Sequence, residues 1–357
     1  MSSSEPKVRS AAAERARRAG FVLPFVVVAT AIIAILALAA ISTVWHGYRA
    51  ARLAANGVRA QFGGDEAVAL QLDAWPAESL AAVALGATIS TRVTTAVGDS
   101  VRVRITRTQP LIAWLTADVI LGPLGTPGRV RRHVTRVLSL DPPALPIVGA
   151  LTAIAAVHGQ DPTTIDGRDR ADATDACGPV RDTASRMPIA STALVDSPGG
   201  TWTGPSATLT LVDTATVRAA FDQAWISVLA RSLIRAPDSM PQRLAALPGW
   251  HALLLDGSTV SLQSPSRWRG LLAVHGDLIV TGSLDVEGVL LVRGRLDARG
   301  AALRVRGALL VASLGHREVE LGDQTHVQYD RCAVHMALAT IAEPRTRPFS
   351  IWYSPQH

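Results

Sequence analysis

The sequence predicts an α+β protein in which a long N-terminal transmembrane and amphipathic helix packs on an antiparallel-sheet head, followed by a short β-solenoid. Three observations carry this prediction. No Lys, Arg, Asp or Glu occurs from Ala19 to Tyr48. Short segments with strand-like alternation fill much of the chain after residue 83. Near the C-terminus, glycines recur with a six-residue period from Gly270 to Gly300.

The uncharged run predicts a membrane-spanning helix. Its thirty residues, from Ala19 to Tyr48, exceed the about 20 that cross a bilayer as an α-helix. The residues before it carry five basic side chains and two acidic ones, a net charge of 5 − 2 = +3. The positive-inside rule therefore predicts that the N-terminus stays in the cytoplasm and that the chain after Tyr48 is exported.

Pro24 indicates where the mature helix begins. A proline inside a helix removes a hydrogen bond and clashes with the preceding turn. Cleavage between Gly20 and Phe21 would place Pro24 in the first turn, where proline is tolerated. A secretory signal peptide is disfavoured, because its apolar core would span only roughly 7–15 residues and end at a small-residue cleavage site. A plain signal-anchor helix remains the alternative.

This N-terminus resembles that of a type IV prepilin, with a short basic leader ending at Gly20, then Phe21, then a long apolar helix. The resemblance implies cleavage after Gly20 by a prepilin peptidase, N-methylation of Phe21, and contacts with other pilins or pseudopilins through helix one. The fifth residue after the cleavage point is usually Glu in that family and is Phe25 here. This departure favours a minor pilin or a pseudopilin over a major pilin.

The helix is expected to continue beyond the membrane as an amphipathic extension. Apolar residues recur at spacings of three and four, which predicts one stripe docking on the head. Gly63–Gly64 is expected to kink or stop the helix, and Trp75–Pro76 to interrupt a second helical piece. The stripe comprises Val44, Tyr48, Ala51, Ala55, Val58 and Phe62.

The head is expected to contain strands at 88–95, 100–108, 111–121, 130–138 and 208–212, a short apolar element at 147–158, and a helix at 215–235. The second strand alternates most clearly, with Val101, Val103 and Ile105 on one face.

Two polar segments of the head suggest binding sites. A basic cluster at Arg129, Arg131, Arg132, His133 and Arg136 lacks interleaved aromatic residues, so a solvated face is favoured over a nucleic-acid site. The acidic run at 166–172 lies in a polar segment, 161–188. It lacks the ligand spacing of a calcium loop, and arginines separate its acids, which favours a solvated loop.

The glycine period predicts the solenoid. Each segment between glycines has apolar residues at its third and fifth positions, such as Leu272 and Val274, as in stacked β-coils. An antiparallel meander is the alternative, but its turns would lack the Asn-Gly or Asp-Gly pairs that suit them. The repeat resembles the β-helical segments of bactofilin-like polymers.

A longer period predicts that one wall of this coil is apolar on both faces. The second and fourth positions are both apolar in every third segment, at spacings of 18 or 19 residues. The outer face of this wall would then be covered by another element, such as the helix at 215–235. These pairs are Leu271/Ala273, Val289/Leu291 and Ala308/Leu310.

The sequence contains few other candidate functional residues. Cys177 and Cys332 both lie in the exported part, where one disulfide is expected; two free buried thiols are the alternative. Outward carboxylates at Asp277, Asp285 and Asp297 suggest a glycosidase or lyase pair but are more typical of a soluble surface. We find no catalytic motif and expect no enzyme activity, metal site or cofactor.

The sequence therefore predicts a minor pilin-like structural or assembly subunit of a type IV pilus. We expect it in the inner (cytoplasmic) membrane, in contact with lipid, with its head in the periplasm or on the cell surface and no nucleic-acid partner. A type II secretion pseudopilin, or a signal-anchored surface protein whose solenoid binds or cleaves polysaccharide, remain alternatives. The expected parts are a leader at 1–20, a transmembrane helix at 21–48, its amphipathic extension at 49–82, an α+β head at 83–265, the solenoid at 266–330 and a tail at 331–357.

Overall fold

The computed structural model describes residues 10–75, 77–122, 129–170, 177, 185–196, 199–204, 210–211, 213–230, 234–236, 247–313 and 318–347. The side chains of 10–22, 77–78, 210–211, 235–236 and 347 are outside this description. The chain divides into two compact units, one formed by residues 1–62 with 119–132 and the other by 63–118 with 133–357.

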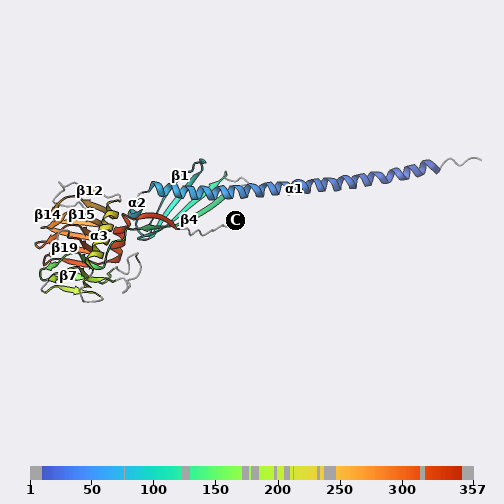
Figure 1. Ribbon diagram of the computed structural model, residues 1–357. Helices are drawn as coiled ribbons and strands as arrows, with labels where there is room; N and C mark the ends of the chain where they lie inside the picture. The colour runs from blue at the N-terminus through green and yellow to red at the C-terminus, as the bar shows by residue number, and fades with distance from the viewer. Residues whose placement is uncertain are drawn as a thin grey trace, which may run out of the picture. The chain divides into compact units, whose positions relative to one another are not determined.

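Helix α1, Ser10–Ala74, is one helix of 65 residues that includes Pro24 (Figure 1). The prediction that Gly63–Gly64 would kink or stop it is wrong, because helical structure continues through both glycines. Each glycine costs about 1 kcal/mol relative to alanine in a helix, which is small when neighbouring turns are buried. The helix ends just before Trp75, and the short helix α2, Ala77–Ala82, follows.

The buried face of α1 is not the predicted one. Val58 and Phe62 of the expected stripe are 57% and 68% exposed, whereas Ala60 and Ala67 are fully buried. The buried positions lie on the opposite side of the helix from the predicted stripe, about 180° around its axis at 100° per residue. Small side chains on this face allow close approach of the backbone, a property that a search for large apolar residues misses. The buried residues are Gly57, Ala60, Gly63, Gly64, Ala67, Val68 and Gln71.

An antiparallel sheet follows the helix, in the order β1-β2-β3-β4-β22. Its alternation is as predicted, since Val101, Val103 and Ile105 of β2 are buried. The end of α1 is tied to this sheet by polar contacts. Asp65 accepts a hydrogen bond from Arg136 at 2.6 Å, and Glu66 accepts one from the backbone N–H of Ala96 at 2.7 Å. The strands are β1, Thr88–Thr94; β2, Ser100–Gln109; β3, Ile112–Leu121; β4, Val130–Asp141; and β22, Glu343–Arg347.

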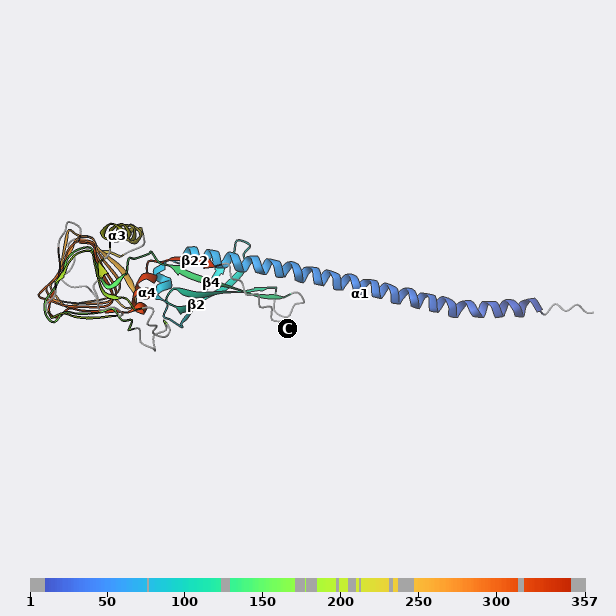
Figure 2. The same ribbon diagram turned by 60° about the horizontal axis from the view of Figure 1, so that its bottom comes forward.

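Between β4 and β22 the chain forms a second architecture, in which parallel strands stack turn upon turn. We call the strands β5 to β21 the parallel coil. Figure 2 shows its three-sided outline, with helix α3, Thr214–Leu229, outside it. The first group of strands is β5, Gly149–Ala153; β6, Val157–Gly159; β7, Thr164–Asp166; β8, Met187–Ser191; β9, Val195–Asp196; β10, Thr201–Thr203; and β11, Thr210–Leu211. The second group is β12, Ile234–Ala236; β13, His251–Leu255; β14, Thr259–Leu262; β15, Ser266–Val274; β16, Asp277–Val280; β17, Ser283–Val292; β18, Leu296–Ala298; β19, Ala302–Val311; β20, Val319–Leu321; and β21, His326–Tyr329.

The pairing within the coil is parallel and in register with the glycine period. Leu272 of β15 lies beside Leu290 of β17, which lies beside Leu309 of β19. The antiparallel meander would have paired these segments in the opposite direction. The strands of 149–211, which we had expected in the α+β head, also pair in parallel with the coil. Leu151 of β5 is the partner of Leu309, so this first group of strands continues the stack.

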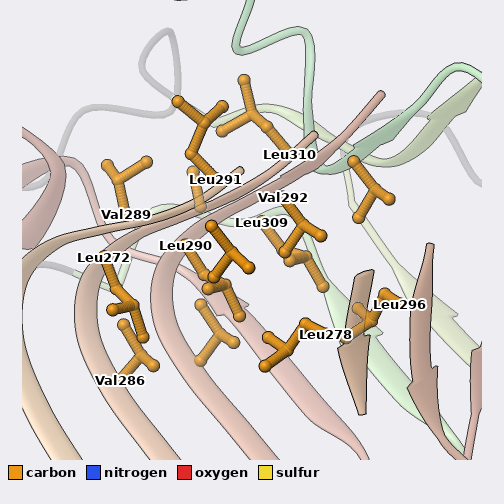
Figure 3. Packing of buried hydrophobic residues seen from close by; sticks show 14 of the residues in the cluster. Leu272, Leu278, Val286, Val289, Leu290, Leu291, Val292, Leu296, Leu309 and Leu310 are labelled. Carbon is orange, nitrogen blue, oxygen red and sulfur yellow. The ribbon is translucent and has the colours of Figure 1, made fainter. Parts of the chain in front are cut away.

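One wall of the coil is apolar on both faces. Figure 3 shows Val289, Leu291 and Leu310 on one side of this wall and Leu290 and Leu309 on the other. All five are at most 1% exposed. Helix α4, Arg331–Ala339, contacts strands β15, β17 and β19 of this wall. Helix α3, which the sequence suggested as the cover, adds four buried side chains to the same core: Val217, Phe221, Trp225 and Val228.

A column of glycines makes the bend between two walls possible. Gly270, Gly288 and Gly307 are direct partners in successive turns, and all have positive φ, from 128° to 143°. A Cβ atom on Gly288 would lie 2.2 Å from the carbonyl oxygen of Gly270, and one on Gly307 would lie 1.8 Å from that of Gly288. Backbone thus occupies the space that any side chain would need.

We predict that Val289→Asp destabilises the protein strongly, by more than about 3 kcal/mol, because it places an unpaired charge in a fully buried position. The control is Asp285→Val, since the Asp285 side chain is 48% exposed and makes only a loose ion pair with Arg267 at 3.6 Å. Thermal melts of the detergent-solubilised chain would compare the two. Equal tolerance of both changes would contradict the covered wall.

The glycine column gives a second prediction. Gly288→Ala should lower the melting temperature severely or prevent folding, because both its φ and the adjacent carbonyl exclude a Cβ. Gly300→Ala is the matched control, since a Cβ there meets no atom within 4 Å. The same melts measure both variants, and similar melting temperatures would show that the bend can shift to accept a side chain.

Candidate functional site

Helix α1 has the composition of a membrane span. Within the described residues, Leu23–Ala74 contains a window with a mean hydropathy of 2.8, none of which is buried. Large apolar side chains are exposed around the whole helix, including Phe25 at 73% and Leu36 at 64%. A helix that is apolar on all sides and unburied is suited to a lipid or protein environment rather than to water.

Two threonine hydroxyls in this span donate hydrogen bonds within the helix. Thr30 donates to the carbonyl oxygens of Val26 and Val27, both at 2.9 Å, and Thr43 donates in the same way to the preceding turn. Such internal bonding is required in a bilayer, where no water compensates a free polar group. Trp45 and Tyr48 follow, at the end of the uncharged run, where aromatic side chains favour the membrane interface.

The predicted processing site lies in the first part of α1. Gly20 and Phe21 have helical backbone, and their side chains are outside the described part of the structure. The helical backbone therefore says nothing about processing, and cleavage after Gly20 stays a prediction.

The second site is the helix α4, at the point where the chain leaves the parallel coil. Asp330 caps this helix by accepting a hydrogen bond from the backbone N–H of Ala333 at 3.0 Å. Its other carboxylate oxygen accepts from Arg306 of β19 at 2.6 Å, and its side chain is 1% exposed. A buried carboxylate needs such partners, because an unpaired one is strongly destabilising. One residue thus fixes the start of α4 against the coil.

Asp169, from a different segment of the chain, also holds the start of α4. Its side chain is fully buried, and its Oδ1 accepts from the backbone N–H of Arg331 at 3.0 Å. The Arg331 guanidinium lies 3.4 Å from Oδ2 of the same carboxylate. Further along α4, burial and then the nearby Arg331 cation lower the pKa of His335, which favours a neutral ring. The Asp169 contacts tie the segment before Cys177 to the first turn of α4.

Cys177 and Cys332 are joined by a disulfide in the structure, with their Cα atoms 5.5 Å apart and 155 positions apart in sequence. Because Cys332 lies in the first turn of α4, the bond ties the polar segment to the same helix as the Asp169 contacts do. Metal-ligand groups of three or more His, Cys, Asp or Glu are absent from the described residues.

Arg107 connects α4 with the antiparallel sheet, and no pattern in the sequence predicts this role. Its side chain is almost fully buried and donates to the carbonyl oxygens of Val83 at 3.1 Å and Pro110 at 2.7 Å. It also lies 3.4 Å from the sulfur of Met336 on α4. Burial lowers the pKa of Arg107 to about 10, which still leaves it a cation near neutral pH. Backbone carbonyls therefore solvate this charge inside the protein.

The three outward carboxylates do not form a catalytic pair. Asp285 lies on a different wall of the coil from Asp277 and Asp297. A hydrogen bond from the Arg299 guanidinium lowers the pKa of Asp297, which outweighs the effect of partial burial. Asp277 accepts from the backbone N–H of Arg295 at 2.8 Å. A glycosidase acid would need a raised pKa, so their geometry favours structural roles.

Charged side chains of the basic cluster and the acidic run also form ion pairs within the protein. In the basic cluster, Arg136 pairs with Asp65 and His133 with Asp118. The prediction of a solvated loop for the acidic run is wrong at Asp166 and Asp169, which are both buried, and Asp166 lies in β7 and pairs with the Arg168 guanidinium at 2.7 Å. The last acid of that run, Asp172, lies outside the described residues.

Comparison with known proteins places the chain in no family. No protein-family model and no curated protein sequence matches it. Among solved structures, the competence-associated pilin ComZ from Thermus thermophilus aligns with 83% of this chain and 96% of its own, at 12% sequence identity and a TM-score of 0.20. So low a TM-score does not establish a common fold.

The cysteine pair gives a testable prediction. Non-reducing peptide mapping should recover one peptide pair linked through Cys177 and Cys332, because the structure brings their Cα atoms within bonding range. Closing so long a loop contributes about 2–5 kcal/mol, so the Cys177→Ser/Cys332→Ser double variant should unfold at a lower temperature. Alkylation of both thiols without reductant would refute the bridge.

Proposed function

We propose that this chain is a minor pilin-like structural subunit of a type IV pilus or a related filament, cleaved after Gly20 and N-methylated at Phe21. The main support for this proposal is the N-terminal segment, in which a basic leader ends at Gly20 and an uncharged run continues to Tyr48. In support, this run belongs to one helix that extends to Ala74 and is followed by the short helix α2 and then by an antiparallel sheet.

The exposed stripe of α1 supports the proposed assembly. Beyond the uncharged run, Val58 and Phe62 remain 57% and 68% exposed on the helix. Large apolar side chains that recur along one helix face are typical of a protein contact. In the proposal, helix one of a neighbouring pilin or pseudopilin covers this stripe, and lipid surrounds the segment before Tyr48.

The proposed subunit is not an enzyme and works with a prepilin peptidase on the cytoplasmic side of the inner membrane. Its head lies in the periplasm or on the cell surface. The same observations fit a type II secretion pseudopilin. A signal-anchored surface protein with a polysaccharide-binding or -cleaving coil is the second alternative, and it differs by leaving the leader uncut.

The mass of the mature N-terminus tests the proposal. We predict that the native protein begins with N-methyl-Phe21, and that Gly20→Arg leaves the leader attached, because the peptidase must accommodate the residue before the cut. Ala13→Arg is the matched control, since it adds the same charge to the leader without touching the cleavage point. An intact leader in the native protein, or an N-terminus near Ala40, would overturn the proposal.

A further inference from the structure

A cavity opens on the outer surface of the parallel coil, on the wall formed by residues 266–269 and the strand segments paired with them. Its volume is about 280 Å³. This is just below the range of small-ligand pockets, roughly 300–1,000 Å³, which limits a ligand to about one monosaccharide-sized group. Neither the membrane helix nor the coil's apolar core uses it. The lining residues are Leu247, Pro248, Gly249, Arg267, Arg269 and Glu287.

Part of the cavity is held rigid by paired charges. Arg269 donates two hydrogen bonds to Glu287, at 2.8 and 3.0 Å, and its guanidinium lies 5.0 Å from the centre of the Trp250 ring. Each carboxylate oxygen of Glu287 has a second lone-pair direction, so Glu287 can still accept from a ligand hydroxyl. This pair therefore forms a preorganised floor with a hydrogen-bond acceptor.

Arg267 is the group available to a ligand. Its side chain is 71% exposed, and its ion pair with Asp285 is loose at 3.6 Å. An exposed guanidinium with so loose an ion pair can bind a planar carboxylate through two parallel N–H···O bonds. The side chains of Leu247 and Pro248 provide an apolar wall for the C–H face of a ring.

The charge of the lining selects the ligand class. The lining itself, Arg267 and Arg269 against Glu287, sums to 2 − 1 = +1, and adding Asp285 beside Arg267 brings the sum to 2 − 2 = 0, which favours a ligand with at most one negative charge. A phosphate monoester, with a charge near −2, would leave excess negative charge beside Glu287 and Asp285. Hydroxyls for Glu287, a C–H face for the apolar wall and one carboxylate for Arg267 are combined in an acidic sugar.

We propose that this cavity binds a uronic-acid residue of a glycan, with Arg267 holding its carboxylate and Glu287 accepting from a ring hydroxyl. This inference is independent of the filament role, because it uses only the coil. It describes binding alone, with no bond made or broken.

Titration of the full-length, detergent-solubilised protein with methyl β-D-glucuronide tests this. Methyl β-D-glucoside is the matched neutral probe, since it differs only in carrying a hydroxymethyl group in place of the carboxylate. We expect saturable binding of the glucuronide, followed by ligand-observed NMR, and at least about tenfold weaker binding of the glucoside, as loss of a charge-assisted bidentate contact predicts.

Arg267→Ala should weaken glucuronide binding about tenfold, and Arg267→Lys should retain part of it, because Lys keeps the charge but loses the bidentate fork. Arg304→Ala is the control. Arg304 is exposed on the same wall two strands away and does not line the cavity. Unchanged thermal melts would show that the variants are folded. No saturation up to about 50 mM, equal binding of both probes, or an equal loss in Arg304→Ala would each overturn the proposal.

Discussion

The parallel coil depends on a backbone bend that leaves no room for a side chain. At Gly270, Gly288 and Gly307 each turn passes from one wall to the next, with its Cα against the carbonyl of the preceding turn. Because these positions coincide in register, the residues that follow them coincide as well. The inner row of Leu272, Leu290 and Leu309 and the outer row of Leu271, Val289 and Ala308 are both consequences of the same column. The outer row would expose apolar surface without α4, so the bend also determines that a helix must cover this wall.

The coil is an insertion in the antiparallel sheet, and its two ends lie together. The chain enters at Gly149 and leaves at Tyr329, and the strands at both points pair with β19. It then forms α4 and returns to the sheet through β22, beside β4. Helix α4 therefore carries three kinds of connection at once. Its start is held by Asp330 and Asp169, its first turn carries the disulfide, and Met336 meets the buried Arg107 of the sheet.

The sequence predicted the parts of this structure in which residues of one type recur with a regular period. The six-residue glycine period revealed the turns between 270 and 311, and alternation revealed β2. The strands of 149–211 complete the same stack, but they are short, lack the glycine period and are interrupted by polar segments, so nothing local distinguished them from an antiparallel head. The role of Arg107 could not be predicted from the sequence, for a different reason. Arg107 occupies a core-facing position of a strand, where a cation is acceptable because carbonyl oxygens accept from it, that of Val83 from a distant part of the chain and that of Pro110 from the turn after the strand. The cavity at Arg267 likewise depends on a loop near residue 248 that folds over a strand segment nearly twenty residues later.

Helix one shows most clearly why composition alone leaves a choice open. It carries two stripes on opposite sides, one of small residues that includes Ala60 and Ala67 and one of large residues that includes Val58 and Phe62. Burying large side chains releases more free energy per residue, which is why they predict the docked face. In this protein the small face is buried, and the large apolar side chains are left outside. In the filament that we propose, this is the more useful arrangement. Close packing along the small residues uses little of the helix's apolar surface, and the large side chains remain available to the helices of neighbouring subunits.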